Sequence, residues 1–422
     1  MNYFPSKYFT YIDDKLHCEK VNLKELANEF GTPLFVYSKN FFIDRYNELD
    51  EAFKSIKHRI YFASKANFNL SVIKTFYGLG SGVDVNSIGE FYRAIKAGVD
   101  PKDMLLTGVG KTDEEIKLGL EKGVLVIKAE SLEEVYVINS IAAELGIMAP
   151  VAIRVNPDVD AQTHPYISTG LAENKFGIDT AYAYDMFVEC SKLSNINLIG
   201  IDMHIGSQIT TIEPFVEAVI KMAGLYKKVQ SAGIPLKHFD IGGGIGVLYN
   251  NESPFTPKEL ADKLIPIFMQ LDAEIMFEPG RFLTANGGVL LSDVLYTKTN
   301  SLGKNFVVVN SAMTELLRPS LYQSYHHVQP IEQIDNVDFK TDIVGPVCET
   351  GDYIAKEREI TMVSRGDTLA IMSAGAYGMV MSSNYNGRRR PAEILVDGSE
   401  YKVIRSRETF EHLIFDENLH LS

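Results

Sequence analysis

The stretch VDVNSIGEFYRAIKAGVDPKDMLLTG, residues 83–108, contains one complete strand–helix–strand unit. Its two ends, VDV and MLLTG, are short apolar runs of the kind that form buried strands. Between them apolar residues recur at helical spacing, and Gly98 follows the last turn, where a helix C-terminus favours glycine. This alternation of strand and helix is typical of α/β folds.

The same alternation continues on both sides of this stretch. Eight short apolar runs occur between residues 59 and 281, and they begin at Arg59, Val83, Met104, Val124, Val151, Leu198, His238 and Glu274. Eight strand–helix units predict a (β/α)8 TIM-like barrel, which we expect to cover residues 30–285. A doubly wound open sheet is the alternative arrangement.

The pattern changes after about residue 286. Short strand-like runs separated by turn residues follow one another, and they are FVVVN, DIVG, EITMV, TLAIM, EILV and YKVI. They predict an all-β C-terminal domain over residues 286–422. Residues 1–29 include the strand-like stretch YFTYIDDKLHCE, which could pack on this β domain.

Composition narrows the class of protein. With 422 residues, 45% hydrophobic and 23% charged, the chain is expected to be a soluble globular protein of two or three domains. Its net charge of −14 disfavours nucleic acid and membrane partners. Three cysteines are too few for a disulfide framework. Because the sequence has neither a leader pattern nor an apolar run of about 18 residues, we expect a cytoplasmic location.

Lysine, histidine and serine side chains follow two of the predicted barrel strands. The loops after the strands build the active face of such a barrel. Lys65 follows the first run in YFASKANFN, where a partly desolvated amine could act as a nucleophile, or could simply reach solvent. His204 and Ser207 follow the sixth run in HIGSQ and offer an imidazole and a hydroxyl.

The seventh and eighth runs end in glycine-rich turns. Gly242, Gly243 and Gly244 in DIGGGIG let backbone N–H groups approach an anion, although a tight turn explains the glycines equally well. The eighth run ends in FEPGR, which contains Glu278, Gly280 and Arg281. Phosphate sites of these barrels often lie after strands seven and eight, so we expect an anion site here.

Three further elements lie in the predicted β domain. Arg318 and Tyr322 in RPSLY face the same way if Pro319 opens a helical turn, and could bind a carboxylate; a solvated arginine is the alternative. Cys348 and Glu349 in GPVCETGD lie in a turn-rich loop, where the thiol could be accessible. Tyr377 in GAYG could direct a hydroxyl at a phosphate or could be a packed aromatic.

We expect no metal site. His326 and His327 are adjacent and would face apart on a strand, and no HExxH or CxxC motif occurs. Asp158, Asp160 and His164 in NPDVDAQTH could resemble a metal loop, but Asx turns after Asn156-Pro157 explain them better. Cys190, inside a helical pattern, is expected to be a small core residue.

Taken in order, YFASKAN, NPDVDAQTH, KFGI, HIGSQ, DIGGGIG, EPGR, RPSLY, GPVCETGD and SAGAYG resemble the motifs of a known family. The chain is similar to the diaminopimelate decarboxylases, which belong to the fold-type III pyridoxal-phosphate-dependent decarboxylases, from about residue 30 to 400. The resemblance implies a cofactor, pyridoxal 5'-phosphate, bound by the barrel. It also implies a homodimer with shared active sites at the subunit interface.

The resemblance implies roles for individual residues. Lys65 would form the Schiff base with the cofactor, His204 would stack on its ring, and Glu278 would pair with the pyridine nitrogen. The residues expected to hold the phosphate are Ser207, Gly243, Gly244, Gly280, Arg281 and Tyr377. The residues expected to bind the substrate are Arg281, Arg318 and Tyr322 for the distal carboxylate, Glu349 for the distal ammonium, and also Tyr377. Cys348 would deliver the proton that replaces CO₂.

The implied reaction converts meso-2,6-diaminopimelate into L-lysine and CO₂, the last step of lysine biosynthesis. Ornithine is a poorer fit because it has no second carboxylate for the two arginines. Three alternatives stay open. They are a decarboxylase of another carboxylated or basic amino acid, a pyridoxal-phosphate-binding protein without activity, and a metal-dependent barrel hydrolase with Asp158, Asp160 and His204 as ligands.

Overall fold

The computed structural model describes residues 3–160, 170, 175–333 and 337–417, and these form two compact units. The barrel unit comprises Ile43–Val247 and Glu252–Leu283. The β unit comprises Met1–Phe42, Leu248–Asn251 and Thr284–Ser422.

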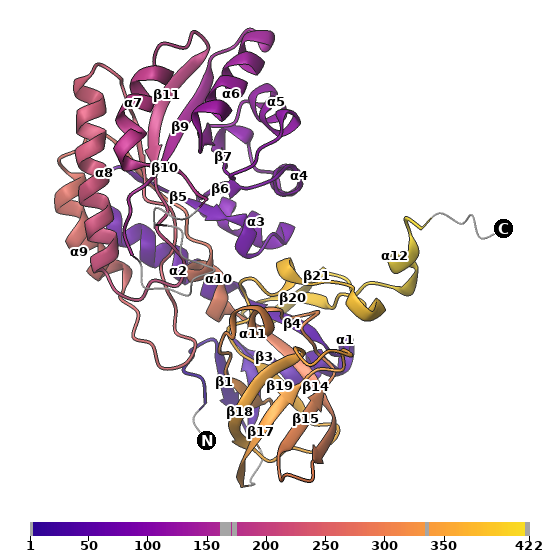
Figure 1. The fold of residues 1–422 in the computed structure, drawn as a ribbon. Coiled ribbons are helices and arrows are strands. Elements are labelled where there is room, and N and C mark those ends of the chain that lie inside the picture. Colours follow the sequence, from indigo (N-terminus) through magenta and orange to yellow (C-terminus); the bar gives the residue numbers. More distant parts are fainter. Residues whose placement is uncertain (1–2, 161–169, 171–174, 334–336, 418–422) are drawn as a thin grey trace. The chain divides into compact units, whose positions relative to one another are not determined.

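Eight parallel strands form the barrel (Figure 1). They are β5 (His58–Ala63), β6 (Gly82–Val85), β7 (Met104–Leu106), β8 (Val126–Ala129), β9 (Ala149–Asn156), β11 (Ile196–Asp202), β12 (His238–Asp240) and β13 (Glu274–Phe277). The pairing of β9 with β8 closes the ring, and the short β10 (Ile178–Asp179) pairs with the end of β9. All eight predicted runs are strands, so the barrel is confirmed and the open sheet is wrong.

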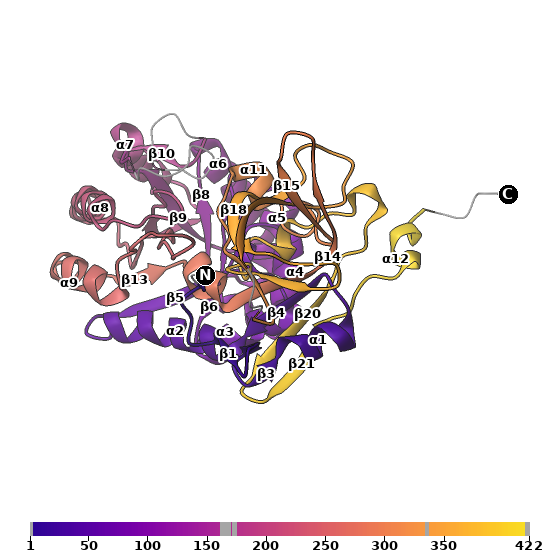
Figure 2. The same cartoon turned by 90° about the horizontal axis from the view of Figure 1, so that it is seen from below.

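Helices connect the strands and lie outside them (Figure 2). They are α2 (Lys39–Phe53), α3 (Leu70–Gly78), α4 (Ile88–Lys96), α5 (Asp113–Lys122), α6 (Leu132–Leu145), α7 (Thr180–Cys190), α8 (Glu213–Ser231) and α9 (Pro257–Phe268), with 3-10 turns at η1 (Ser64–Ala66) and η2 (Pro101–Asp103). Capping explains several of their starts, because Ser87, Ser131 and Asp179 accept backbone N–H groups there. Gly98 has a left-handed φ of 92° just past the end of α4, as expected of a C-terminal glycine.

The inside of the barrel has an apolar layer and a charged layer. A buried cluster contains Tyr61, Leu105, Val126, Ala152, Ile199 and Met276. Side chains two positions apart on a strand face the same way. Lys128, Arg154 and Glu278 each lie two positions beyond a member of this cluster, so they form a second layer toward the carboxyl ends of the strands.

The β unit contains two sheets. The smaller sheet consists of β1 (Phe9–Ile12), β2 (Lys15–Cys18) and β3 (Val21–Asn22). The larger sheet runs β18 (Tyr353–Thr361), β17 (Asp338–Val344), β15 (Asn305–Val309), β14 (Gly288–Thr299), β4 (Leu34–Ser38), β20 (Ala392–Asp397) and β21 (Glu400–Arg405), while β19 (Thr368–Ile371) pairs with β14 and β16 (Val328–Pro330). The helices and turns are α1 (Leu23–Phe30), η4 (Ala285–Gly287), α11 (Arg318–Tyr322), η5 (Met379–Met381), η6 (Tyr385–Gly387) and α12 (Phe410–Ile414). The short helix α10 (Arg281–Thr284) lies at the end of the barrel unit.

The six strand-like runs predicted after residue 286 are all strands, which confirms the β-rich C-terminal region. The long strand β14 was not among them, although it pairs with β15, β19 and β4. The stretch predicted near the N-terminus forms the β1–β2 hairpin, whose turn residues Asp13 and Asp14 have positive φ. Such a turn suits Asp, which tolerates the left-handed region better than most residues.

We predict that Gly82→Ala destabilises the barrel. A Cβ at Gly82 would lie 2.3 Å from the Tyr61 ring and 2.7 Å from the carbonyl oxygen of Asp103. Overpacking of this kind costs about 1–3 kcal/mol of unfolding free energy, which urea denaturation measures. The matched control is Gly224→Ala in α8, where a Cβ would have no heavy atom of the described residues within 4 Å apart from its chain neighbours and the nearby backbone of its own helix. This control should gain about 0.5–1 kcal/mol, and equal unfolding midpoints for both variants would contradict the prediction.

Candidate active site

Lys65 lies immediately after β5, in the single turn η1. Its Nζ is 4.0 Å from Oδ2 of Asp84 on the neighbouring strand β6, and 39% of its side chain is exposed. The preceding Ser64 is buried, with its hydroxyl 2.9 Å from both the Asp84 carbonyl oxygen and the Glu90 carboxylate. The turn is therefore fixed, while the lysine itself stays accessible at the carboxyl-terminal rim of the barrel.

The glycine loop after β12 packs directly against His204. Nδ1 of His204 accepts the N–H of Gly243 at 3.1 Å, so its proton is on Nε2. Loss of solvation lowers the pKa of His204 well below its ordinary value, and the nearby Lys65, Arg154 and Lys128 lower it further. The imidazole is therefore neutral.

Close packing requires the glycines of this loop. A Cβ at Gly243 would lie 2.3 Å from the carbonyl oxygen of Glu278, and one at Gly244, whose φ is 102°, would lie 2.5 Å from that of Gly206. Close packing against the loops that carry Glu278 and Gly206 thus accounts for both glycines. It leaves room for an anion site, because among the described residues the Gly244 N–H has no hydrogen-bond partner.

Arg281 joins the loops after the sixth and eighth strands. Its guanidinium is buried and donates from Nε and Nη2 to the hydroxyl of Ser207 at 3.3 and 3.0 Å. Gly280 lies against the Lys65 turn, since its Cβ would be 2.9 Å from Cβ of Ala66. A cation, a hydroxyl and a backbone N–H therefore lie on loops at the rim of the barrel, a donor set suited to a phosphate.

Glu278 is part of a buried ionic cluster that the sequence interpretation missed. Nζ of Lys128 donates to Asp202 at 2.8 Å, to Asp240 at 2.6 Å and to Glu278, and all four side chains are at most 5% exposed. A lysine inside the apolar run VLVIKA was the signal available, because a fully buried lysine needs anionic partners. The cluster forms the charged layer inside the barrel, toward the carboxyl ends of the strands.

Burial controls the protonation of this cluster. It raises the pKa of Glu278 well above the ordinary value, the carboxylates of Asp240 and Asp84 raise it further, and Lys128 opposes the rise. Burial likewise raises the pKa of Asp240 to about 6, against the lowering effect of Lys128. Both directions have the same cause, since several carboxylates share one ammonium in a region without solvent.

The arginine predicted to bind a carboxylate is held by a histidine in the β unit. Arg318 is buried in α11, stacks 4.6 Å from the ring centre of Tyr249, and donates from Nη1 to Nε2 of His326 at 2.8 Å. Nδ1 of His326 therefore donates to the carbonyl oxygen of Met372 at 2.9 Å. His326 was considered only as a metal ligand in the sequence, but it orients Arg318. Tyr322 ends the same helical turn, as predicted.

Cys348 and Glu349 lie in the loop between β17 and β18, and both are exposed. The loop is tied to α11, because the Ser320 hydroxyl donates to the Gly351 carbonyl oxygen at 2.7 Å. The N–H of Cys348 donates to Oδ1 of Asn386 at 3.2 Å. The predicted accessibility of the thiol is confirmed, and the cysteine and the arginine helix lie at one end of the β unit.

Tyr377 and Cys190 differ in their surroundings. Tyr377 has a φ of 55°, a left-handed conformation that costs energy in a residue with a side chain, and it is only partly buried.

Cys190 is fully buried in α7, as expected of a core residue, and burial raises the pKa of its thiol to about 12.

Asp158, Asp160 and His204 do not belong to the group of described side chains whose metal-binding atoms lie close together. The N–H of Asp158 donates to Oδ1 of Asn156 at 3.0 Å, which confirms the predicted Asx turn, and His164 lies outside the described residues. Within the described part of the chain, the group of acidic or metal-binding side chains with ligand atoms close together is Asp202, Asp240 and Glu278. The Lys128 ammonium binds all three of these carboxylates.

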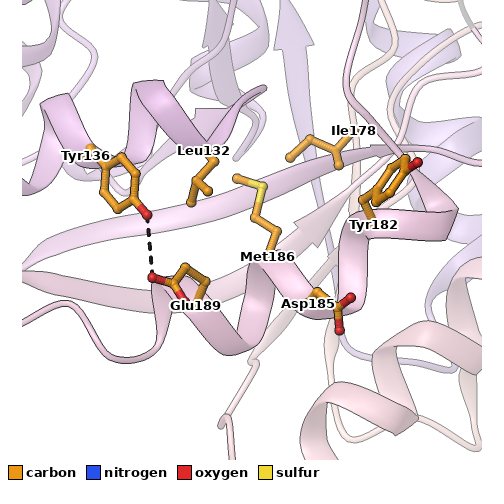
Figure 3. Close-up of a pocket in the computed structure, with 7 residues that line it drawn as sticks. All are labelled: Leu132, Tyr136, Ile178, Tyr182, Asp185, Met186 and Glu189. Carbon is orange, nitrogen blue, oxygen red and sulfur yellow. Dashed lines mark hydrogen bonds between the residues drawn. The ribbon is translucent and has the colours of Figure 1, made fainter.

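A separate pocket of about 460 Å³ lies on the outside of the barrel unit (Figure 3). Its walls come from α6, β10 and α7, and the residues are Leu132, Tyr136, Ile178, Tyr182, Asp185, Met186 and Glu189. Mostly apolar side chains form it, with Asp185 and Glu189 at its edge. None of the residues expected to act in chemistry lines this pocket.

Known proteins are similar to this chain over nearly its whole length. The family model for the pyridoxal binding domain of pyridoxal-dependent decarboxylases matches residues 40–285. Diaminopimelate decarboxylase of Aquifex aeolicus is 45% identical over 408 residues, 96% of each chain. The enzyme of the same name from Pseudomonas aeruginosa is 45% identical over 411 residues, 97% of this chain and 99% of the relative.

Solved structures give the same result. Diaminopimelate decarboxylase from Helicobacter pylori, complexed with L-lysine, has a TM-score of 0.91 and 41% identity over 94% of this chain and 99% of its own. The M. jannaschii enzyme, also in complex with L-lysine, has a TM-score of 0.93 and 35% identity over 98% of each chain. None of the described helices is long and apolar enough to cross a membrane.

We predict that Asp240→Asn flattens the pH dependence of stability between pH 4 and 6. The pKa of Asp240 rises from 3.8 to about 6 on folding, so the folded state keeps a proton that the unfolded state loses. Wild-type stability therefore falls as pH rises through this window, by up to about 1.4 kcal/mol per pH unit for this group. Urea unfolding of cofactor-free protein at pH 4, 5 and 6 measures the slope.

The control for this prediction is Asp262→Asn in α9. Asp262 is an exposed carboxylate that pairs with Lys258 on the surface. Its replacement should leave the slope as in wild type. Identical slopes for Asp240→Asn and wild type would show that Asp240 ionises normally in the folded protein.

Proposed function

Because this chain belongs to the diaminopimelate decarboxylases, within the pyridoxal-dependent decarboxylases, we propose that it converts meso-2,6-diaminopimelate into L-lysine and CO₂. It is then a carboxy-lyase with pyridoxal phosphate as its cofactor. The observation that carries the proposal is the contact between two turns at the barrel rim. The N–H of Ala63, just before Lys65, donates to the carbonyl oxygen of Pro279, just after Glu278, at 3.2 Å.

The rim residues fit the cofactor. The bound cofactor supplies an electron sink for the pair of electrons released when CO₂ leaves. Lys65 is accessible and would hold the cofactor covalently, and His204 is neutral and would pack against its ring. Glu278 would pair with the pyridine nitrogen and keep it protonated. The phosphate would be held by Ser207, Gly243, Gly244, Gly280, Arg281 and Tyr377.

The β-unit residues fit a substrate with two charged ends. Arg318 is buried, fixed by His326 and Tyr249, and would bind the distal carboxylate together with Arg281 and Tyr322. Glu349 would bind the distal ammonium, and Cys348 would give a proton to the α-carbon. A substrate without the distal carboxylate could not accept the charge-assisted hydrogen bonds that the guanidinium groups of Arg318 and Arg281 can donate. This favours diaminopimelate over ornithine.

We further propose a cytoplasmic homodimer in which each active site uses both chains. Cys348 and Glu349 are exposed in an isolated chain, although their proposed roles require an enclosed site. An isologous dimer would cover both loops at once, since each chain presents the same surface. The three cysteines are all free thiols, which fits a reducing compartment.

We predict CO₂ release from meso-diaminopimelate and none from ornithine, arginine or lysine. The assay compares these four amino acids with added pyridoxal phosphate. Lys65→Ala is the matched variant, and it should lose nearly all turnover and the visible absorption of the bound cofactor, because it lacks the amine. Release from ornithine at a comparable rate would refute the substrate assignment. A wild-type absorption band in Lys65→Ala would refute the role of the lysine.

We predict that two inactive variants complement each other when they are co-expressed. A heterodimer of Lys65→Ala with Cys348→Ala has two active sites. If each site uses both chains, one site carries both substitutions and the other site carries neither. About half of randomly assorted dimers are mixed, so activity should return to roughly a quarter of wild type. Each variant alone is the control. Activity no higher than the controls, in a sample shown to contain heterodimers, would refute the shared site.

A further inference from the structure

Lys128 holds Glu278 from the inside of the barrel. The ammonium has three N–H donors, and each has one carboxylate partner, namely Asp202 on β11, Asp240 on β12 and Glu278 just after β13. The register places Asp202 directly beside Asp240. Two carboxylates on neighbouring strands therefore fix the position of the Lys128 ammonium. The ammonium in turn restricts the position of the Glu278 carboxylate.

The direction of this constraint follows from the positions of the four residues. Asp202 and Asp240 are the last residues of their strands, whereas Glu278 belongs to the turn that leads to Arg281. A turn residue has more conformational freedom than a strand residue. The lysine thus binds two partners that end strands and one partner that lies beyond the end of a strand.

Charge supports the same conclusion. One ammonium is buried with three carboxylates, and Nε of Arg154 is 3.9 Å from Asp202. Burial raises the pKa of Glu278 and of Asp240, and the neighbouring carboxylates raise both further. A protonated pyridine nitrogen beside Glu278 would add the missing positive charge. The cluster is therefore electrostatically complementary to that nitrogen, provided that Glu278 is held in place.

We propose that Lys128 is a positioning residue, which orients the Glu278 carboxylate toward the pyridine nitrogen of the cofactor. This inference rests on the role of Glu278 given under the proposed function. Lys128 acts only through Glu278 and touches neither the cofactor nor the substrate. A purely structural lysine would instead neutralise the three carboxylates without regard to the orientation of Glu278.

A double-variant cycle on cofactor binding separates these two roles. The full-length variants are Lys128→Met, Glu278→Gln and the combination of both, and the readout is the dissociation constant of pyridoxal phosphate with no amino acid present. Loss of a hydrogen bond to a charged group is worth about tenfold or more in affinity. We expect Lys128→Met to weaken binding about tenfold in the wild-type background and less than about twofold in the Glu278→Gln background.

The control is Lys111→Met. Lys111 is a similarly buried lysine whose ammonium pairs with Glu134 at 2.7 Å and donates to the backbone carbonyl oxygens of Gly108 and Lys128, but to no carboxylate of the cluster. Its replacement should change the dissociation constant by the same small factor in both backgrounds. The positioning role is refuted if Lys128→Met changes the dissociation constant by the same factor in both backgrounds. It is also refuted if Lys128→Met binds the cofactor as tightly as wild type.

Two further measurements keep the test decisive. If Lys128→Met does not fold, the same cycle is run in an Asp240→Asn background. The double variant Lys128→Met/Asp240→Asn, which loses one positive and one negative charge, is then compared with Asp240→Asn alone. In the holoenzyme, Lys128→Met should lower kcat with little change in KM, because Glu278 faces the cofactor and not the substrate. Since the binding cycle needs no amino acid, a wrong substrate would leave its result intact.

Discussion

Closure of the eight-stranded barrel is the constraint on which the active face depends. Every backbone N–H and C=O of a buried strand must be paired, and the β8–β9 pairing completes this without leaving an edge. Because all eight strands are parallel, their carboxyl ends meet at one rim. Lys65, His204 and Glu278 are far apart in the sequence, yet each follows one of these ends.

The second constraint is the burial of charge just inside that rim. The apolar layer at Val126, Ala152 and Met276 fills the barrel, and two positions further along the same strands the side chains become charged. Burying ions costs free energy unless each has partners, which explains why Lys128 has three. The cluster that results is short of positive charge. This deficit suits the barrel to a cationic ring nitrogen.

The β unit prepares its functional residues in a different way. Arg318 is fixed by a neutral histidine and by an aromatic ring rather than by a carboxylate, so its charge is not neutralised by these two neighbours. Cys348 lies in a loop that is tied to α11 and to Asn386 but leaves the thiol exposed. A fixed cation near a fixed loop is suited to a small anionic ligand.

The sequence by itself determined the barrel, the β-rich region and the motifs at the strand ends, because strand and helix periodicity and glycine turns are local properties. It also indicated Lys65, Glu278 and Arg318. It did not reveal β14, Lys128 or the role of His326. Each of these depends on partners distant in the chain, such as Asp202, 74 residues beyond Lys128. Only the tertiary structure decides these features, because the free energy of a buried charge depends on which groups the fold brings within a few ångströms of it.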